Sequence, residues 1–194
     1  MSSYKIKKRL FDLILGTLLI PLFAILIFIF ILPNFYILKS NPFFLQIRSG
    51  MNGHPIKIIK IKTMFDNSNL KEKERIYNYG RFLRKYKLDE LPQIFNVIFG
   101  DLSLVGPRPL FIEYVEKYSN FERQRLSSKP GITGLAQVRL KDSGNWRSKI
   151  KYDVWYTKNK SIKLDLKIIC ETIKLLLNII FFKVNLIEDH KLKS

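Results

Sequence analysis

The chain has 194 residues, which is long enough for one modest domain with a hydrophobic core. Its single cysteine, Cys170, excludes an internal disulfide and a cysteine cluster for a metal, as fits a reducing compartment. The formal net charge of +18 indicates an anionic partner: nucleic acid, lipid headgroups or a phosphorylated substrate. Because the mean hydropathy is close to zero (−0.01) despite this charge, the apolar residues must be concentrated in one part of the chain.

The apolar residues gather near the N-terminus. The twenty residues from Leu13 to Leu32 carry no charge, and a helix of that length would cross the ~30 Å hydrocarbon core of a membrane. A signal peptide is a less favoured interpretation, because its apolar stretch is usually ~7–15 residues long and a small-residue cleavage site should follow. The segment is therefore predicted to lie in the membrane.

Two features predict that this segment enters and leaves the membrane on one side. Pro21 lies near its middle, where a proline removes a backbone hydrogen bond and kinks or breaks a helix. Basic residues, which mark the cytoplasmic side, flank both of its ends: Lys5, Lys7, Lys8 and Arg9 before it, and Lys39, Arg48, Lys57, Lys60 and Lys62 after it. A re-entrant helix–break–helix explains both flanks, and a tilted single span is the alternative.

The pattern changes after Pro33 and Asn34. Residues 44–48 and 56–62 are predicted to be strands joined by a turn at residues 50–53. A helix is predicted over residues 91–99, because its apolar residues recur on one face and Gly100 ends it. Residues 111–126 are a second predicted helix.

A third helix is predicted over residues 164–182, which are mostly apolar. Its polar residues are spaced 4, 3 and 4 positions apart and so form one stripe: Lys167, Glu171, Lys174 and Asn178. Such a helix can lie in the headgroup layer with its apolar side in lipid. It can equally be a core helix with one narrow wet face, and the sequence favours neither interpretation.

Adjacent carboxylates, Asp89 and Glu90, follow a run of four cations: Arg81, Arg84, Lys85 and Lys87. From spacing alone the favoured interpretation is structural, with Asp89 as a helix N-cap, Glu90 as a first-turn acid and Pro92 as a first-turn proline. The functional interpretation uses the same geometry. A carboxylate among cations stays ionised, as a nucleophile or a magnesium ligand must, and arginines can bind phosphate oxygens in pairs.

Two loops carry further signals. Pro107 and Pro109 stiffen the backbone around Arg108, so this loop is predicted to project one arginine, although a packing corner would have the same sequence. Residues 129–134 form a turn whose glycines allow close backbone approach to a ligand.

In this order and spacing, the segments resemble the bacterial sugar transferase family, the small monotopic phosphoglycosyl transferases that initiate surface glycan assembly. The resemblance extends from Lys8 to about Ile173. The matching segments are residues 8–12, 46–50, 60–64, 88–93, 100–109 and 129–137, followed by Asp153, Tyr156 and Asp165.

The resemblance implies a mixed α/β fold that is mainly α. Residues 1–34 would be the re-entrant membrane helix with its basic N-terminal flank, and residues 186–194 a polar tail. Residues 35–185 would be a small catalytic domain with a short sheet and amphipathic interfacial helices. The resemblance places the protein in the bacterial inner (cytoplasmic) membrane, with the catalytic domain on the cytoplasmic face.

The resemblance also implies a mechanism. The aspartate of the acidic pair attacks the β-phosphorus of a UDP-sugar and expels UMP, and undecaprenyl (polyprenyl) phosphate then attacks the covalent phosphosugar intermediate. This assigns the nucleophile to Asp89 and a supporting role to Glu90, with Mg²⁺ as the cofactor held by both. The other implied site residues are Lys60, Arg84, Arg108, Gln137 and Lys141 for substrate and phosphate, and Pro21 as the break in the re-entrant helix.

Some residues depart from the family pattern, and other functions remain to be considered. The departures are Ile20, Lys62, Lys87 and Lys141, the last of which replaces an arginine that would bind phosphate more tightly. A membrane-tethered nucleic-acid-binding protein is disfavoured, because the carboxylate pair lies inside the most basic run, and no nucleic acid partner is expected. A structural membrane subunit would not need the Arg108 loop. An inactive scaffold of the same family is the more serious alternative, and the sugar and a homodimeric state are left open.

Overall fold

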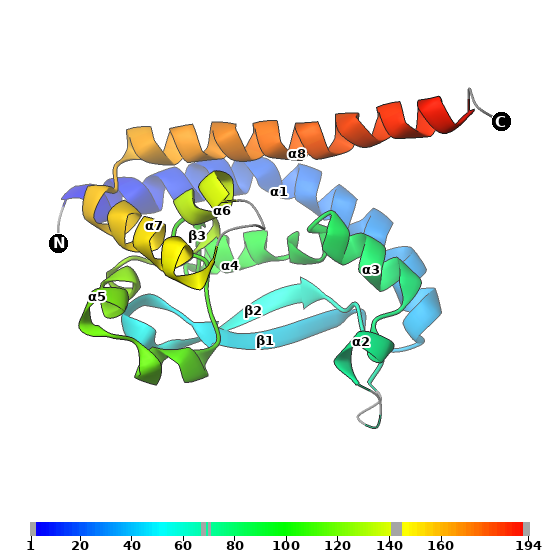
Figure 1. Cartoon of the computed structure of the whole chain (residues 1–194), viewed down its shortest axis with the longest axis horizontal. Helices are drawn as coiled ribbons and strands as arrows, with labels where there is room; N and C mark the ends of the chain where they lie inside the picture. Colours follow the sequence, from blue (N-terminus) through cyan, green and yellow to red (C-terminus); the bar gives the residue numbers. More distant parts are fainter. Residues whose placement is uncertain (1–2, 67–68, 70, 141–144, 192–194) are drawn as a thin grey trace.

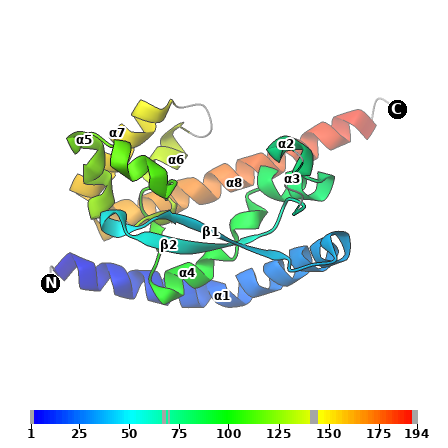
Figure 2. The same cartoon turned by 90° about the horizontal axis from the view of Figure 1, so that it is seen from below.

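The computed structural model describes residues 3–66, 69, 71–140 and 145–191, which form a mainly helical fold with two short sheets (Figure 1). One sheet is the antiparallel hairpin of β1 (Phe43–Ser49) and β2 (Pro55–Ile61), and the other is the parallel pair of β3 (Ser103–Val105) and β4 (Gly131–Thr133). The hairpin crosses the molecule between two groups of helices (Figure 2). On one side lie α1 (Ser3–Leu38) and α4 (Gln93–Phe99), and on the other lie α5 (Asn120–Arg123), α6 (Leu135–Leu140) and α7 (Trp146–Asn159). The predicted mixed, mainly α class is confirmed.

Helix α1 (Ser3–Leu38) contains the predicted membrane segment. It runs without interruption through both Pro21 and Pro33, so the predicted break at Pro21 is wrong. A proline removes one hydrogen bond and disturbs one turn, and an apolar helix of 36 residues retains the rest of its hydrogen bonds. The helix instead changes direction gradually, and its second half bends towards the start of β1 (Figure 1).

The predicted hairpin is confirmed. Each end of each strand differs from its predicted position by one residue. Its register pairs Phe44 with Lys60 and Arg48 with Ile56. The turn contains a 3₁₀ helix, η1 (Met51–Gly53), in which Asn52 and Gly53 adopt φ values of 57° and 82°. Left-handed backbone at these positions suits Asn and Gly, which is why the turn forms here.

Helix α4 (Gln93–Phe99) is the predicted helix of residues 91–99, and Gly100 ends it with φ 94°. Its N-cap is Pro92, whereas Asp89 lies in a separate 3₁₀ helix, η2 (Leu88–Glu90). The interpretation of Asp89 as the N-cap of this helix is therefore wrong. Helix α3 (Asn78–Lys85) precedes η2, and Lys87 between them adopts a left-handed conformation with φ 59°.

The predicted helix over residues 111–126 is wrong, because this segment folds as three short pieces. These are η3 (Ile112–Lys117), α5 (Asn120–Arg123) and η4 (Gln124–Ser127). The physical reason is Ser119, whose hydroxyl accepts from the Glu122 amide while the Glu122 carboxylate accepts from the Ser119 amide. This capping box starts a new helix where the prediction continued the old one.

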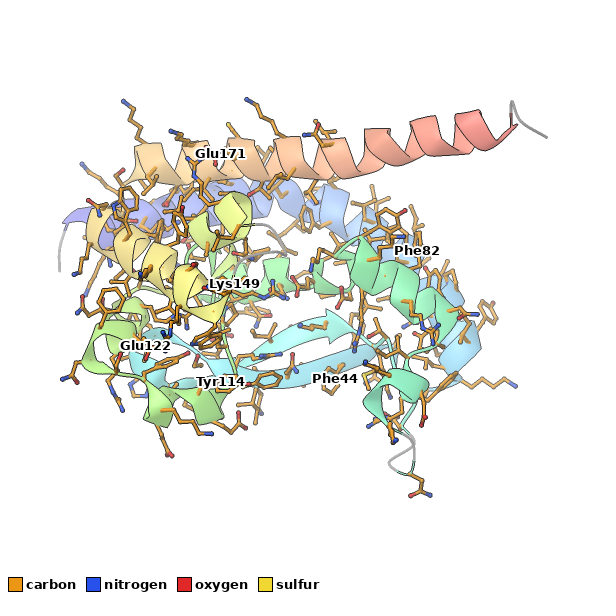
Figure 3. The ribbon with its side chains drawn as sticks, viewed as in Figure 1. Phe44, Phe82, Tyr114, Glu122, Lys149 and Glu171 are labelled. Atoms are coloured by element: carbon orange, nitrogen blue, oxygen red, sulfur yellow. The ribbon has the colours of Figure 1, made fainter. Side chains whose placement is uncertain are left out.

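The C-terminal helix α8 (Ile162–Lys191) is longer than predicted and combines both interpretations of its stripe. Ile168 is buried in the core, and the Thr172 hydroxyl lies 2.7 Å from the Thr133 hydroxyl. Glu171 pairs with Arg139 of α6 (Leu135–Leu140) at 3.2 Å (Figure 3). Other apolar residues are exposed: Leu166, Ile173, Leu176 and Leu177. One face is thus a core face, and another is available to lipid.

One hydrophobic core joins the elements that carry the site. Its fully buried members come from β2, α4, the bend before β3, β3, α7 (Trp146–Asn159) and α8: Ile58, Ile94, Val97, Leu102, Val105, Tyr156 and Ile168. Tyr156 donates from its hydroxyl to Asp165 at 2.7 Å, and Asp165 pairs with Lys8 of α1 at 2.8 Å. The two long helices are thereby fixed to the same core.

Candidate active site

The acidic pair lies in η2, in the turn between α3 and α4 and in contact with β2. Asp89 is only 8% exposed, and the Glu90 side chain is only 11% exposed. Burial of two neighbouring carboxylates is costly unless cations compensate them. The surrounding residues supply such cations from three separate segments of the chain.

Glu90 is held by two cations. Arg108 donates from Nη2 to Glu90 Oε1 at 2.6 Å and from Nη1 to Oε2 at 3.4 Å, and Lys60 Nζ lies 3.5 Å from Oε1. Burial by itself would raise the pKa of Glu90, but the attraction of Arg108 and Lys60 outweighs it and lowers the pKa. Glu90 is therefore ionised in the folded protein.

Asp89 has the opposite electrostatic balance. Burial raises the pKa of its carboxyl above the usual range, and the neighbouring Glu90 charge raises it further. Lys60 and Arg84 act against this rise without cancelling it. The more weakly stabilised carboxylate of the pair is Asp89, which is the one predicted to be the nucleophile.

Arg84 reaches the site from α3. Its Nε donates to the Thr63 hydroxyl at 2.8 Å, and its charge acts on Asp89. The close approach of α3 to this segment depends on Gly80, because a Cβ there would lie 2.3 Å from the Thr63 carbonyl oxygen. The structure thus brings Arg84, Lys60 and Arg108 around the acidic pair, as predicted for these three residues.

The Arg108 loop follows β3 and is packed backbone to backbone against the turn that leads into β4. A Cβ on Gly131 would lie 2.1 Å from the Gly106 nitrogen, so only glycine fits there. The Arg108 carbonyl accepts a 2.7 Å hydrogen bond from Nη2 of Arg125. The stiff loop predicted from the two prolines is therefore also held by a side chain.

Sequence reasoning missed Arg125. This residue is 2% exposed, and its Nη2 and Nε atoms lie 2.7 and 3.1 Å from Asp153 Oδ2. From the sequence, Asp153 is identified only through its match to the family pattern. The link between them could not be found from spacing, because the partners are 28 positions apart and belong to η4 and α7.

An open pocket lies beside Glu90, and its space amounts to about 280 Å³ when the solvent at its mouth is included. Three cations and one carboxylate line it: Arg48, Lys60, Arg108 and Glu90. The other lining residues are uncharged: Gln93, Ile58, Pro109, Gly131 and Ile132. Arg48 and Gln93 were not among the predicted site residues. Their signal was present, since both fall within segments that match the family.

The remaining predicted residues lie elsewhere. Gln137 of α6 donates from Nε2 to the carbonyl of Ile132 at 3.1 Å, so it contacts a lining residue without lining the pocket itself. Pro21 is exposed on α1. Lys141 lies outside the described residues.

Helix α1 is long and apolar enough to cross a membrane, and it is the one such helix in the part of the chain that the structure describes. Its most apolar window is only 11% buried. The exposed residues follow one face at helical spacing: Ile14, Leu18, Leu22, Ile25, Ile29 and Leu32. An exposed apolar stripe of this length indicates contact with lipid.

An apolar surface helix joined to a cation-rich pocket and a buried carboxylate pair is the architecture of a membrane-associated transferase. The family model described as bacterial sugar transferase matches residues 3–179, so the chain belongs to this family.

Individual relatives agree. The chain is 41% identical over 174 residues to an uncharacterized sugar transferase, EpsL, of Bacillus subtilis (strain 168), covering 87% of this chain and 86% of that protein. It is 38% identical over 186 residues to a UDP-glucose:undecaprenyl-phosphate glucose-1-phosphate transferase of Klebsiella pneumoniae, covering 86% of this chain and 39% of that protein. It is 36% identical over 187 residues to a protein of the same name from Caulobacter vibrioides, covering 89% and 70%. The chain thus spans most of the Bacillus protein but under half of the Klebsiella protein.

Proposed function

We propose that this chain transfers a sugar 1-phosphate from a UDP-sugar to undecaprenyl phosphate, releases UMP and so initiates the synthesis of a surface glycan. Two of its relatives carry names for this reaction with UDP-glucose as the donor. The observation that carries the proposal is the buried Asp89 beside an ionised Glu90 and the cations Lys60, Arg84 and Arg108. This arrangement suits a carboxylate that must attack an anionic phosphate.

The proposed reaction has two displacements at the same phosphorus. A carboxylate oxygen of Asp89 attacks the β-phosphorus, the bond to the bridging oxygen breaks, and UMP leaves with that oxygen. A phosphate oxygen of undecaprenyl phosphate then attacks, releases the Asp89 carboxylate and forms a polyprenyl diphosphate sugar. Arg84 and Arg108 stabilise charge on the phosphoryl oxygens, and Lys60 assists them.

Mg²⁺ fits the residues of this site. This ion is usually held by one or two carboxylates together with substrate phosphates and water, and Asp89 and Glu90 would supply the carboxylates. Among the described residues, groups of three or more His, Cys, Asp or Glu side chains do not come together, so the remaining ligands would be phosphate oxygens and water. Bound Mg²⁺ would neutralise the diphosphate charge that repels an incoming carboxylate.

The contacts of α1 support a re-entrant placement, and the basic residues that flank its apolar segment at both ends favour the cytoplasmic face. Near its N-terminal end, Arg9 donates to the Val97 and Ile98 carbonyls at 2.6 Å each. Near its other end, Asn34 donates to the Lys62 carbonyl at 2.9 Å. Since both ends are bound to the same polar domain, that domain and both ends belong on one side of the bilayer, where a lipid-linked acceptor can reach the site.

The test is nucleotide release by the full chain in nanodiscs, with Mg²⁺, undecaprenyl phosphate and a panel of UDP-sugars. We expect UMP release that needs both substrates and falls at least 10³-fold in Asp89→Asn. Because Asp89 is ionised at a cost in the folded protein, Asp89→Asn should keep the melting temperature, so lost activity cannot be attributed to unfolding. UDP release would instead mean ordinary glycosyl transfer, and failure with every donor would favour an inactive scaffold.

A further inference from the structure

Arg48 extends from β1 into the pocket, beside the cations already assigned to phosphate. The hairpin register places it there. Arg48 pairs with Ile56 and Phe44 pairs with Lys60, so Arg48, Ile58 and Lys60 project from the same face of the two strands. Ile58 lines the pocket between the two cations. The hairpin thus presents two positive charges to one pocket, with an apolar floor between them.

The guanidinium of Arg48 is pre-oriented by neutral groups. Its Cζ lies 3.5 Å from the centre of the Phe111 ring, and its Nη2 donates to Gln46 Oε1 at 2.8 Å. Within the described residues, its nitrogen atoms make no ion pair with a carboxylate. A stacked guanidinium that lines the pocket is well suited to bind a pair of phosphate oxygens.

Cations outnumber carboxylates in the lining of the pocket. Arg48, Lys60 and Arg108 line it together with one carboxylate, Glu90, while the charges of Asp89 and Glu113 act on Lys60 and Arg48 from outside the lining. Burial lowers the pKa of Arg48, and the positive charge of Arg108 lowers it further. The cations that line the pocket repel one another, so a bound anion would relieve this repulsion.

We propose that Arg48 is a further substrate-binding residue, which with Lys60 and Arg108 forms a subsite for the diphosphate of the nucleotide sugar. Phe111 and Gln46 act as positioning residues, because they fix the plane of the guanidinium before the ligand arrives. The subsite rests on the proposed function for the identity of the donor. That the ligand has two adjacent phosphoryl groups is inferred from the three cations that line the pocket.

The first test measures binding without turnover, by calorimetric titration of the full chain in nanodiscs with UDP, pyrophosphate or uridine in the presence of Mg²⁺. Arg48→Ala should raise the Kd for UDP and for pyrophosphate roughly 10- to 100-fold, the range expected for the loss of a charged hydrogen bond. Arg48→Lys, which keeps the charge without the planar fork, should lie between Arg48→Ala and the unaltered protein. Phe111→Leu should have a smaller effect of a few-fold.

The matched control is Arg147→Ala, which removes the same side chain from an exposed position on α7 outside the pocket. Equal Kd values for Arg48→Ala and Arg147→Ala would overturn the subsite. An effect of Arg48→Ala on uridine but not on pyrophosphate would also overturn it, because Arg48 would then contact the nucleoside. The melting temperature of Arg48→Ala verifies that a loss of binding is not a loss of fold.

The second test separates this subsite from the proposed function. In the UMP-release assay, Arg48→Ala should raise the KM for the donor more than it lowers kcat. If the unaltered protein binds pyrophosphate through Arg48 but releases UMP with none of the donors, the transfer reaction fails and the subsite stands. If it releases UMP and Arg48→Ala has an unchanged KM, the subsite fails and the transfer reaction stands.

Discussion

At the scale of single residues, two adjacent carboxylates have opposite electrostatic environments. Glu90 contacts Arg108 and Lys60 directly, and their attraction lowers its pKa although burial acts in the other direction. Asp89 is buried next to that negative charge, and both effects raise its pKa. Glu90 therefore keeps its charge to lower pH than an ordinary glutamate, whereas Asp89 takes up a proton at higher pH than an ordinary aspartate.

The raised pKa of Asp89 predicts a pH dependence. A nucleophile must be ionised, so kcat/KM should fall on acidification through a pKa above the ordinary aspartate value of about 3.9. Because Lys60 lowers the pKa of Asp89, Lys60→Gln should move the inflection to higher pH. The measurement is the pH profile of UMP release by both proteins with the same substrates, so that titration of the substrates cancels.

The exposed residue Arg147 again provides the control, since Arg147→Gln should leave the profile in place. An inflection in Lys60→Gln at the same or lower pH would contradict the assigned interaction. The size of kcat/KM will fall in Lys60→Gln for a separate reason, the loss of a phosphate contact. The position of the inflection is therefore the informative quantity.

At the scale of elements, the site is assembled from segments that are far apart in the sequence. The pair comes from the turn before α4, Lys60 and Arg48 from the hairpin, Arg84 from α3, and Arg108 from the loop after β3. Two buried contacts hold the Arg108 loop in position relative to the other segments. They are the backbone packing of Gly106 on Gly131 and the hydrogen bond from Arg125 to the Arg108 carbonyl. Neither contact needs to touch substrate to affect the reaction.

The buried ion pair of Arg125 and Asp153 can be tested by separating stability from positioning. Asp153→Asn leaves the Arg125 charge buried without its partner, and the free energy of unfolding should fall by about 3–5 kcal/mol. Arg125→Met combined with Asp153→Leu removes both charges and should recover most of that stability. UMP release by this double variant should nevertheless be lower than that of the unaltered protein, because the Arg108 carbonyl has lost its donor.

Thermal unfolding and UMP release of the single and double variants give the answer. Full activity in the double variant would mean that the pair serves only the fold. An unchanged melting temperature in Asp153→Asn would mean that the buried pair contributes little to stability. The expected pattern, recovered stability without recovered activity, would identify Arg125 as a positioning residue.

The sequence predicted most elements whose pattern is local, and it missed the contacts between distant segments. Alternating apolar residues predicted the hairpin, and the apolar stripe with Gly100 predicted α4. The prediction for residues 111–126 failed although Ser119 and Glu122 carried a capping signal in the sequence. For Arg125, by contrast, local sequence holds little information, because two of its three polar partners, Arg108 and Asp153, are 17 and 28 positions away. The acidic pair was recognised through the family, whereas its unequal electrostatics required the structure.

At the scale of the whole molecule, α1 lies along the domain with one face and exposes its apolar stripe on another. A straight helix of 36 residues would be about 54 Å long, more than is needed to cross the hydrocarbon core. Its two ends are nevertheless bound to the same domain through Arg9 and Asn34. A helix that crossed the bilayer would have to give up one set of these contacts.

This predicts how the two ends are reached by reagents. In a Cys170→Ala background, Lys5→Cys and Lys39→Cys should both be protected from a membrane-impermeant maleimide in intact spheroplasts. Both should react in inside-out vesicles. Reaction of the two positions from opposite sides would establish a spanning helix and contradict the re-entrant placement. An exposed residue of the domain, changed in the same way at Lys163, reports the side on which the domain lies.

The polar contacts of α1 also join residues that are synthesised far apart in time. Arg9 binds the carbonyls that end α4, 88 and 89 positions later in the chain, and Asp12 accepts from the Leu104 amide, 92 positions later. During synthesis these side chains therefore leave the ribosome long before the partners to which they bind. Removing α1 to obtain a shorter catalytic fragment would leave the end of α4 and the start of β3 without these partners, so the helix is part of the folded domain as well as its apolar surface.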